Sequence, residues 1–226
     1  YKRSAIGPFW LTISILFNIL SAAAQDKSNR GKEFWLCYGY NYNFFYEPPA
    51  NSQELAIYIS TEQAATVTVS VTNTSWTQTL NIPANTVDAS ILVPKTGPND
   101  ARIITDGLSN RSIHIVSDVD VAVYAHQYAT MVSGATMLMP SSTYGYMYYS
   151  INYSQATSGS NLPVISPTIQ NGPDWYCWFS VVASENGTRL KITPTDTTKN
   201  GWLPGQTYTI NLNQGEVYTV FGKMVP

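Results

Sequence analysis

The side chains best suited to catalysis are few and lie in extended, apolar surroundings. Only two histidines occur, His114 between Ile113 and Ile115, and His126 at the end of the run 121–126. Each alternates with apolar neighbours, so we interpret both as strand histidines that face solvent or have satisfied hydrogen bonds. The chain has no Gly-x-Ser-x-Gly elbow, no His-Glu-x-x-His pattern and no phosphate-binding Gly-x-x-x-x-Gly-Lys-Ser/Thr loop. We therefore expect no catalytic residue, no enzymatic activity and no cofactor.

The densest acidic cluster is Asp118-Val119-Asp120. We expect it at a hairpin position, where aspartates commonly cap the backbone of a solvated turn. Because Ca²⁺ takes carboxylate oxygens as ligands, Asp118 and Asp120 are also the candidate residues for a metal site. Two carboxylates that hydrolyse a glycoside are recognised by their separation in space. A carbohydrate-active enzyme fragment therefore stays open as the least favoured function.

Tyrosine is the residue type that stands out, with 16 in the chain. Its side chain has a rigid apolar face and a polar tip, so an exposed cluster suits sugars or protein surfaces. One cluster runs over 38–46 and another over 144–149. We expect core positions for Tyr38, Tyr148 and Tyr149, and an exposed loop at the Gly/Asn/Pro-rich end of the first cluster. The candidate binding residues are Tyr40, Tyr42, Tyr46, Tyr144 and Tyr146.

Cys37 and Cys177 are the only cysteines, and each lies in an aromatic run that is typical of a strand. A disulfide between them is chemically permissible in an exported protein. Two buried thiols are favoured slightly, because a β domain of this size needs no covalent staple. No histidine or aspartate clusters with either cysteine, so a zinc site is not expected.

The N-terminal segment has the pattern of a cleavable export signal. Lys2 and Arg3 precede an apolar run over 9–20, and the small residues 21–24 follow. The run has about 12 residues, whereas a membrane span needs about 20. We expect cleavage after residue 24. The chain is therefore predicted to be secreted and extracellular or at the cell surface, with no membrane insertion after cleavage.

Composition limits the partners. Without residues 1–24 the chain holds 10 basic and 14 acidic residues, a formal charge of −4. No basic patch is present to neutralise phosphates, so nucleic acid is not an expected partner. Charged residues make up only 12% of the chain, against about a quarter in ordinary domains. Such a neutral, hydroxyl-rich and aromatic surface is typical of extracellular adhesion domains, whose ligands are glycans or proteins.

The elements that position these side chains are short strands. Alternating apolar and polar runs recur along the chain, bounded by Gly, Pro and Asn, and the Asn186-Gly187 pair predicts a type I′ hairpin turn. This pattern predicts an all-β, β-sandwich-type fold, with a propeller-like arrangement of sheets as the alternative. The expected strands are 34–40, 55–60, 66–71, 77–82, 89–93, 113–116, 121–128, 135–139, 147–153, 175–184, 189–193, 208–212 and 217–221.

An internal repeat organises these strands. Residues 59–69 align with 182–192, and residues 80–87 align with 210–217 in the same order. Two matches in one order favour a duplicated antiparallel unit over chance similarity between hairpins. We predict a signal peptide at 1–24, a first β unit at 25–170 and a second, related unit at 171–226. The second unit is expected to be incomplete, because it shows no counterpart of the segment 111–126.

An ordered series of motifs also runs along the chain. The motifs are Gly31–Trp35, Ile57–Ser60, Ile113–Asp118, Val121–Ala125, Gly134–Pro140, Tyr148–Ser150, Phe179–Thr188 and Leu212–Tyr218. The series resembles the N-terminal domain family of the IgG-Fc-binding protein, which is also common in large secreted or surface proteins of bacteria. The family usually has Lys-Pro where Val119-Asp120 stand here, a difference confined to the expected turn. The resemblance implies a non-enzymatic extracellular domain of a larger multidomain protein. It transfers no binding residue and no IgG binding to this chain.

These observations predict an extracellular or cell-surface adhesion and recognition module without catalytic activity, whose ligand is a glycan or a protein. The alternative is a structural spacer in a large surface protein. Exposure of the tyrosine clusters would favour recognition, and a uniformly polar surface would favour the spacer.

Overall fold

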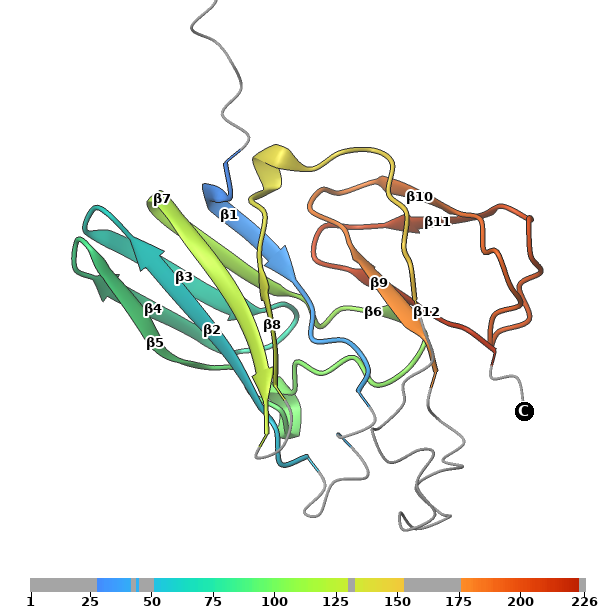
Figure 1. Ribbon diagram of the computed structural model, residues 1–226, viewed down its shortest axis with the longest axis horizontal. Helices are drawn as coiled ribbons and strands as arrows, with labels where there is room; N and C mark the ends of the chain where they lie inside the picture. The colour runs from blue at the N-terminus through green and yellow to red at the C-terminus, as the bar shows by residue number, and fades with distance from the viewer. Residues whose placement is uncertain (1–27, 42–43, 45–50, 130–132, 153–175, 224–226) are drawn as a thin grey trace, which may run out of the picture.

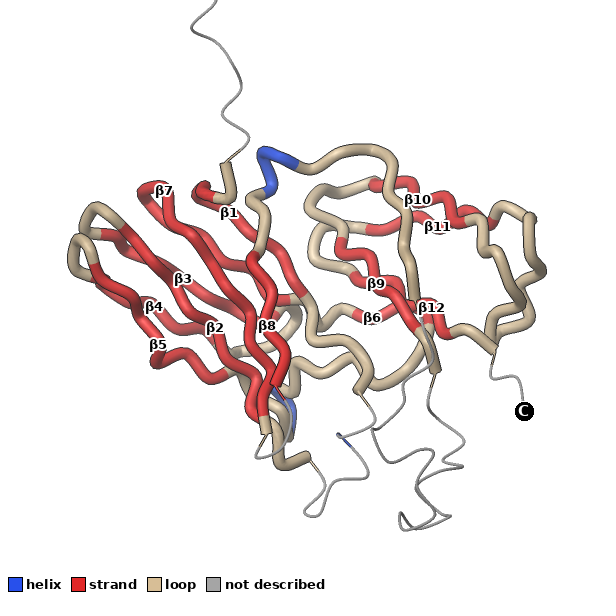
Figure 2. Tube along the Cα trace, in the orientation of Figure 1, coloured by secondary structure: helices blue, strands red, loops and turns tan. Residues whose placement is uncertain are grey.

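The computed structural model describes residues 28–41, 44, 51–129, 133–152 and 176–223. This part of the chain is built of β-strands with two short 3-10 helices, η1 (Gly97–Asn99) and η2 (Ser141–Thr143), so the predicted all-β class is confirmed (Figures 1 and 2). None of its helices is long and apolar enough to cross a membrane. The expected signal peptide lies outside the described residues. The strands are β1 (Arg30–Leu36), β2 (Glu54–Thr61), β3 (Ala65–Val71), β4 (Thr77–Ile82), β5 (Thr86–Leu92), β6 (Gly107–Ser109), β7 (Ile113–Tyr128), β8 (Ser133–Met137), β9 (Trp178–Val182), β10 (Thr188–Ile192), β11 (Tyr208–Leu212) and β12 (Val217–Phe221).

The largest sheet has seven strands and is organised around β7. β3 pairs with β7 over Ile113–Ser117, and β2 pairs with it over Val121–Tyr128. β1 also pairs with β7 in both stretches, and a strand has only two edges, so β2 and β3 share the edge opposite β1. β4 extends the sheet beyond β3, and β5 extends it beyond β2. The sheet thereby bends round on itself until it is nearly closed, and the described strands are not arranged as separate propeller blades (Figure 1).

Asp118, Val119 and Asp120 lie where β7 passes from β3 to β2. The expectation of a hairpin there is wrong, because β7 continues through these residues as one 16-residue strand. The two runs expected at 113–116 and 121–128 are therefore a single element. Alternation continues through the acidic residues, because Asp118 and Asp120 are exposed and Val119 between them packs against the core.

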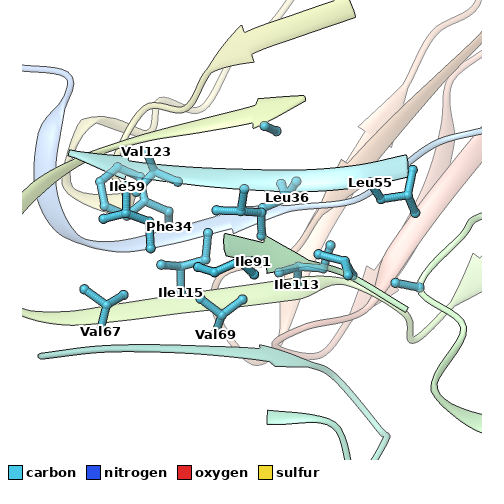
Figure 3. Packing of buried hydrophobic residues seen from close by; sticks show 14 of the residues in the cluster. Phe34, Leu36, Leu55, Ile59, Val67, Val69, Ile91, Ile113, Ile115 and Val123 are labelled. Carbon is cyan, nitrogen blue, oxygen red and sulfur yellow. The ribbon is translucent and has the colours of Figure 1, made fainter. Parts of the chain in front are cut away.

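The core lies inside the bend of the seven-stranded sheet. Phe34, Ile59, Val67, Ile115 and Val123 come from β1, β2, β3 and β7, and each is 0% exposed (Figure 3). Alternate residues of β3 and β7 point inward, as the period of two in the sequence predicts. Burial of these branched side chains is the main stabilising contribution to this part of the molecule.

The C-terminal strands form two smaller sheets beside the large one. β10 pairs with β11, and β12 lies between β9 and β6. β6 comes from the connection between β5 and β7, so a short strand of the N-terminal part completes a sheet of the C-terminal part. Buried Ser112 strengthens this junction by donating from Oγ to the carbonyl of Gly215 over 2.7 Å. The predicted division into units at 25–170 and 171–226 stays a prediction, and β6 links the two stretches.

Candidate binding surface

The segment after β8 is fixed to the large sheet at its start. Pro140 is buried against Gly31 of β1, where an added Cβ would lie 2.4 Å from the proline Cβ. A larger residue than glycine therefore does not fit at position 31. Ser141, the first residue of η2, donates from Oγ to Glu33 Oε2 over 2.8 Å. These contacts hold η2 against β1 and set the direction in which the chain leaves it.

Glu33 connects η2 to the large sheet. Its Oε1 lies 2.9 Å from His114 Nε2, and the His114 ring stacks on Trp35 with 3.8 Å between ring centroids. Burial opposes ionisation of Glu33, but the hydrogen bonds from Ser141 and His114 outweigh it and lower the pKa of Glu33. His114 is thus occupied in a structural contact with a carboxylate and an indole, as expected for a satisfied strand histidine.

Tyr144 follows η2 and is a second anchor. The Trp35 backbone N–H donates to its hydroxyl over 3.3 Å, and the side chain is 37% exposed. Desolvation raises the pKa of Tyr144. Of the candidate binding residues, Tyr144 therefore offers part of one ring face, while its hydroxyl is held by β1.

Beyond Tyr144 the chain presents a run of large apolar side chains to solvent, which we call the Tyr146–Ile151 segment. Exposure is 108% for Tyr146, 77% for Met147, 72% for Tyr148, 90% for Tyr149 and 83% for Ile151. Two local contacts hold its shape, because the Gly145 N–H donates to Tyr148 Oη over 2.7 Å and Tyr149 Oη lies 3.7 Å from Met147 Sδ. The segment crosses from η2 toward the C-terminal sheets as an extended strap (Figure 1).

Two expectations about the tyrosines are wrong. Tyr40 is only 3% exposed, because its ring packs against Phe221 of β12 at 5.0 Å and an interplanar angle of 61°. Tyr148 and Tyr149, for which core positions were expected, are exposed. Tyr38 is buried as expected, and its hydroxyl donates to the carbonyl of Ala56. Tyr42 and Tyr46 lie outside the described residues.

The same stretch of chain is the one that comparison with known proteins identifies. Residues 134–223 match the family described as IgGFc binding protein. The resemblance is thereby confirmed for this stretch, which covers less than half of the chain, and for residues 25–133 it stays a prediction. The chain matches no curated protein and no solved structure at a significant level.

The Tyr146–Ile151 segment, η2 and β9 to β12 all fall within the IgGFc binding protein match. The core strands β1 to β5 and β7 lie outside it. Glu33 and Trp35 of β1 nevertheless hold Ser141 and Tyr144, which precede the segment. The exposed tyrosines of the matched stretch are therefore positioned by residues that precede it in the sequence.

The second histidine has a serine beside it. His126 Nε2 is 2.7 Å from Ser133 Oγ, and its Nδ1 is 3.0 Å from the hydroxyl of Tyr58. A serine nucleophile activated by histidine needs an acidic partner that stabilises the imidazolium, and a phenol hydroxyl in that place supplies no negative charge. The arrangement is that of a hydrogen-bonded cross-strand pair rather than of a catalytic triad.

The candidate metal ligands Asp118 and Asp120 are both exposed residues of β7. Asp118 Oδ1 accepts the backbone N–H of Thr66 over 2.8 Å, so this carboxylate caps the start of β3. Within residues 28–41, 44, 51–129, 133–152 and 176–223, no group of three or more His, Cys, Asp or Glu side chains could hold a metal ion. Asp120 lies instead at the rim of a polar hollow of about 530 Å³ beside η2.

Several of the charged side chains that line this hollow are paired. Arg30 Nη2 lies 2.7 Å from Glu62 Oε1, and Glu33 is hydrogen-bonded to Ser141 and His114. Lys32 and Asp120 also line the hollow. Its lining is therefore polar and charged, unlike the apolar segment that follows η2.

Both cysteines are free thiols, as the sequence favoured. Burial raises the pKa of Cys37 to about 11, although a hydrogen bond with Ser180 of β9 acts in the opposite direction. The thiol is therefore protonated at neutral pH and is a poor nucleophile.

Proposed function

We propose that this chain is a non-catalytic extracellular recognition module and that the Tyr146–Ile151 segment is its contact surface. The observation that carries the proposal is the exposure of five large apolar side chains within six consecutive residues. Single exposed apolar residues are ordinary on protein surfaces, but a contiguous group commonly marks an interaction site. Three of the five are tyrosines, and a fourth is Met147. Tyrosine and methionine are both enriched at protein–protein interfaces.

The segment suits a protein ligand better than an ionic one. It contains no charged residue from Tyr144 to Asn152, so it has no electrostatic means of selecting a phosphate or a carboxylate. Tyrosine rings bring a large contact area with little conformational entropy to lose, and the methionine adapts its shape to a partner. The anchors at Pro140, Ser141 and Tyr144 hold the start of the segment before any ligand arrives, which lowers the cost of binding.

The family match supports a protein partner as well. The description IgGFc binding protein makes the Fc region of IgG the first ligand to test, among other extracellular proteins and glycans. An extracellular location rests on the export pattern in residues 1–24, which would bring the domain to where such ligands occur.

The test is a binding screen of the purified chain against IgG Fc, a panel of extracellular proteins and a glycan array. For a specific ligand we expect the double variant Tyr146→Ser/Tyr149→Ser to weaken binding by about 10- to 100-fold, since central interface tyrosines often contribute 1 kcal/mol or more each. Val87→Ser is the matched control, because Val87 is 63% exposed on β5, a strand that lies away from the segment (Figure 1).

Equal loss of affinity in the control would show that the effect is not local to the segment. A folded chain that binds no member of the panel would overturn the proposal and favour the structural spacer. Folding of each variant is checked by its thermal unfolding midpoint.

A further inference from the structure

The C-terminal strands repeat the pairing of the N-terminal ones. In β3–β4 Ala65 lies opposite Ile82, and in β10–β11 Thr188 lies opposite Leu212. These are the positions that the internal repeat aligns. Inward residues also correspond, because Ile82 and Leu212 are both buried at the end of the second strand. The hairpin β10–β11 is thus equivalent to β3–β4 in register and in the face that it buries.

The second pair of strands is equivalent too. Ile59 lies opposite Asp88 in β2–β5, and Val181 lies opposite Tyr218 in β9–β12. In β9 this structural equivalence is shifted by one residue from the sequence alignment, so that Ile59 corresponds to Val181. With this shift, the turn between β9 and β10 is one residue longer than the turn between β2 and β3. Four strands in the same order and with the same partners support a true duplication.

The central strand β7 of the first unit has no described equivalent in the second. In the first unit β7 pairs with both β2 and β3 and joins the hydrogen-bonded path β4-β3-β7-β2-β5. In the second, β11-β10 and β9-β12 form separate sheets (Figure 1). Among the described strands, β9 pairs only with β12 and β10 only with β11.

The edge of β9 that faces away from β12 is equivalent to the edge of β2 that β7 occupies. The Cys177 carbonyl accepts from the Gly222 N–H and the Ala183 N–H donates to the Glu216 carbonyl, both over 2.9 Å. Successive residues of an antiparallel strand point their backbone N–H and C=O groups toward opposite edges. Because Ser180 is three residues from both Cys177 and Ala183, its N–H and C=O point away from β12. Its equivalent in the first unit, Tyr58, lies opposite Tyr124 of β7.

Apolar side chains of the second unit are also less well covered. Ile59 and Val67, on the two strands that pair with β7, are 0% exposed. Their equivalents Val181 and Leu190 are only partly buried. An additional strand with alternating apolar residues would remove this remaining apolar surface from water.

Positive charge on β10 indicates that the added strand should carry an acidic residue at its bend. At the bend of β7, Asp118 accepts the N–H of Thr66 on β3. The position equivalent to Thr66 is Arg189, and Lys191 is the next residue along on the same exposed face. An acidic residue at the bend of the added strand would therefore meet an N–H and two cationic side chains.

We infer that β9 and β10 are an acceptor site for a strand of β7 type, with alternating apolar residues and an acidic residue at its bend. In the first unit β7 follows β2 to β5 in the chain, with the short β6 between β5 and β7. By the same order, the occupant that we assign to this site is a strand linked on the C-terminal side of β12. The interaction is strand addition, in which backbone hydrogen bonds hold the strand and alternate side chains select it.

The test appends a donor to the full chain. A flexible Gly/Ser linker as long as the connection 93–112 is followed by a second copy of the sequence 113–128, and amide hydrogen exchange is followed residue by residue. We expect exchange at Ser180, Val182 and Arg189 to slow by about tenfold or more, because their N–H groups would gain partners. Exchange in β2 and β3 should not change. A donor of the same composition in scrambled order is the matched control and should leave β9 and β10 unprotected.

Charge reversal tests the acidic position. Replacing the donor residue that corresponds to Asp118 by Arg should reduce the protection, and Arg189→Asp in the chain should restore it. The inference is overturned if β9 and β10 exchange at the same rate with and without the donor. It is also overturned if the donor instead displaces β7 from β2 and β3, or if the chain without a donor dimerises and protects the same edges, since the occupant would then be a second copy.

Discussion

The thiol of Cys37 shows how burial sets the chemistry of one residue. Desolvation raises its pKa to about 11, so at pH 8 only about one thiol in a thousand is ionised. In the variant Cys177→Ser, where Cys37 is the remaining thiol, we expect alkylation by iodoacetamide to be about 100-fold slower than that of an ordinary thiol at the same pH. The control is the same protein in denaturant, where the rate should be ordinary. A fast reaction in the folded state would contradict the assigned burial.

The same group makes stability depend on pH. A thiol whose pKa is raised on folding stabilises the folded state fully below the unfolded pKa of about 9 and loses that contribution as pH rises to about 11. We expect unfolding experiments to show a loss of about 2 kcal/mol over this range. Cys37→Ala should flatten the curve between pH 9 and 11. Burial raises the pKa of Tyr38 in the same direction, so a further loss above pH 10 should persist in the variant. An unchanged slope in Cys37→Ala would assign the alkaline loss to other groups.

At the scale of elements, the sequence predicted most strands because their alternation is local. The ranges 77–82, 208–212 and 217–221 agree with β4, β11 and β12 to the residue. The run 147–153 also alternates in part, yet residues 147–152 form no strand, because no strand of the described part of the chain pairs with them. The Asn186-Gly187 turn is present, but only Gly187 has a positive φ, of 71°, so it is not the type I′ turn that was predicted.

The candidate site was less predictable than the strands, for a related physical reason. Exposure of a tyrosine depends on what covers it, and Tyr40 is covered by Phe221 from β12, far away in the sequence. Tyr146, which the sequence offered as a candidate binding residue, is exposed. The anchoring of Tyr144 by the backbone of Trp35 has no signal in the sequence, because a backbone donor is available at nearly every residue.

Alternation along β7 makes a direct prediction about this element. Ile115 is 0% exposed inside the bend, and its neighbour Val116 is 42% exposed on the outer face. We expect Ile115→Ala to lower the free energy of unfolding by about 2–4 kcal/mol, through lost burial and a cavity. Val116→Ala, one residue away on the same strand, should cost less than about 1 kcal/mol. Chemical denaturation measures both, and similar losses in the two variants would contradict the assignment of the inner face.

At the scale of the whole molecule, the N-terminal and C-terminal sheets are joined too closely to unfold independently. β6 pairs with β12, and the ring of Tyr40 lies against Phe221. Ser112 stands at the centre of the junction, since its Oγ contacts both the Gly215 carbonyl and Thr72 Oγ1. We therefore expect one cooperative transition in which β3 and β11 lose protection against hydrogen exchange together.

Ser112→Ala tests this coupling. The variant leaves the buried Gly215 carbonyl without its serine donor, so we expect a loss of about 1–3 kcal/mol. Ser117→Ala is a matched control in the same strand region, because Ser117 is also buried, yet its Oγ has no hydrogen-bond partner in the described part of the chain. Its removal should cost little or be slightly stabilising. If Ser112→Ala instead lowered the protection of β11 and left that of β3 unchanged, the two sheets would be separate folding units, and the junction through β6 and Gly215 would be a surface contact between them.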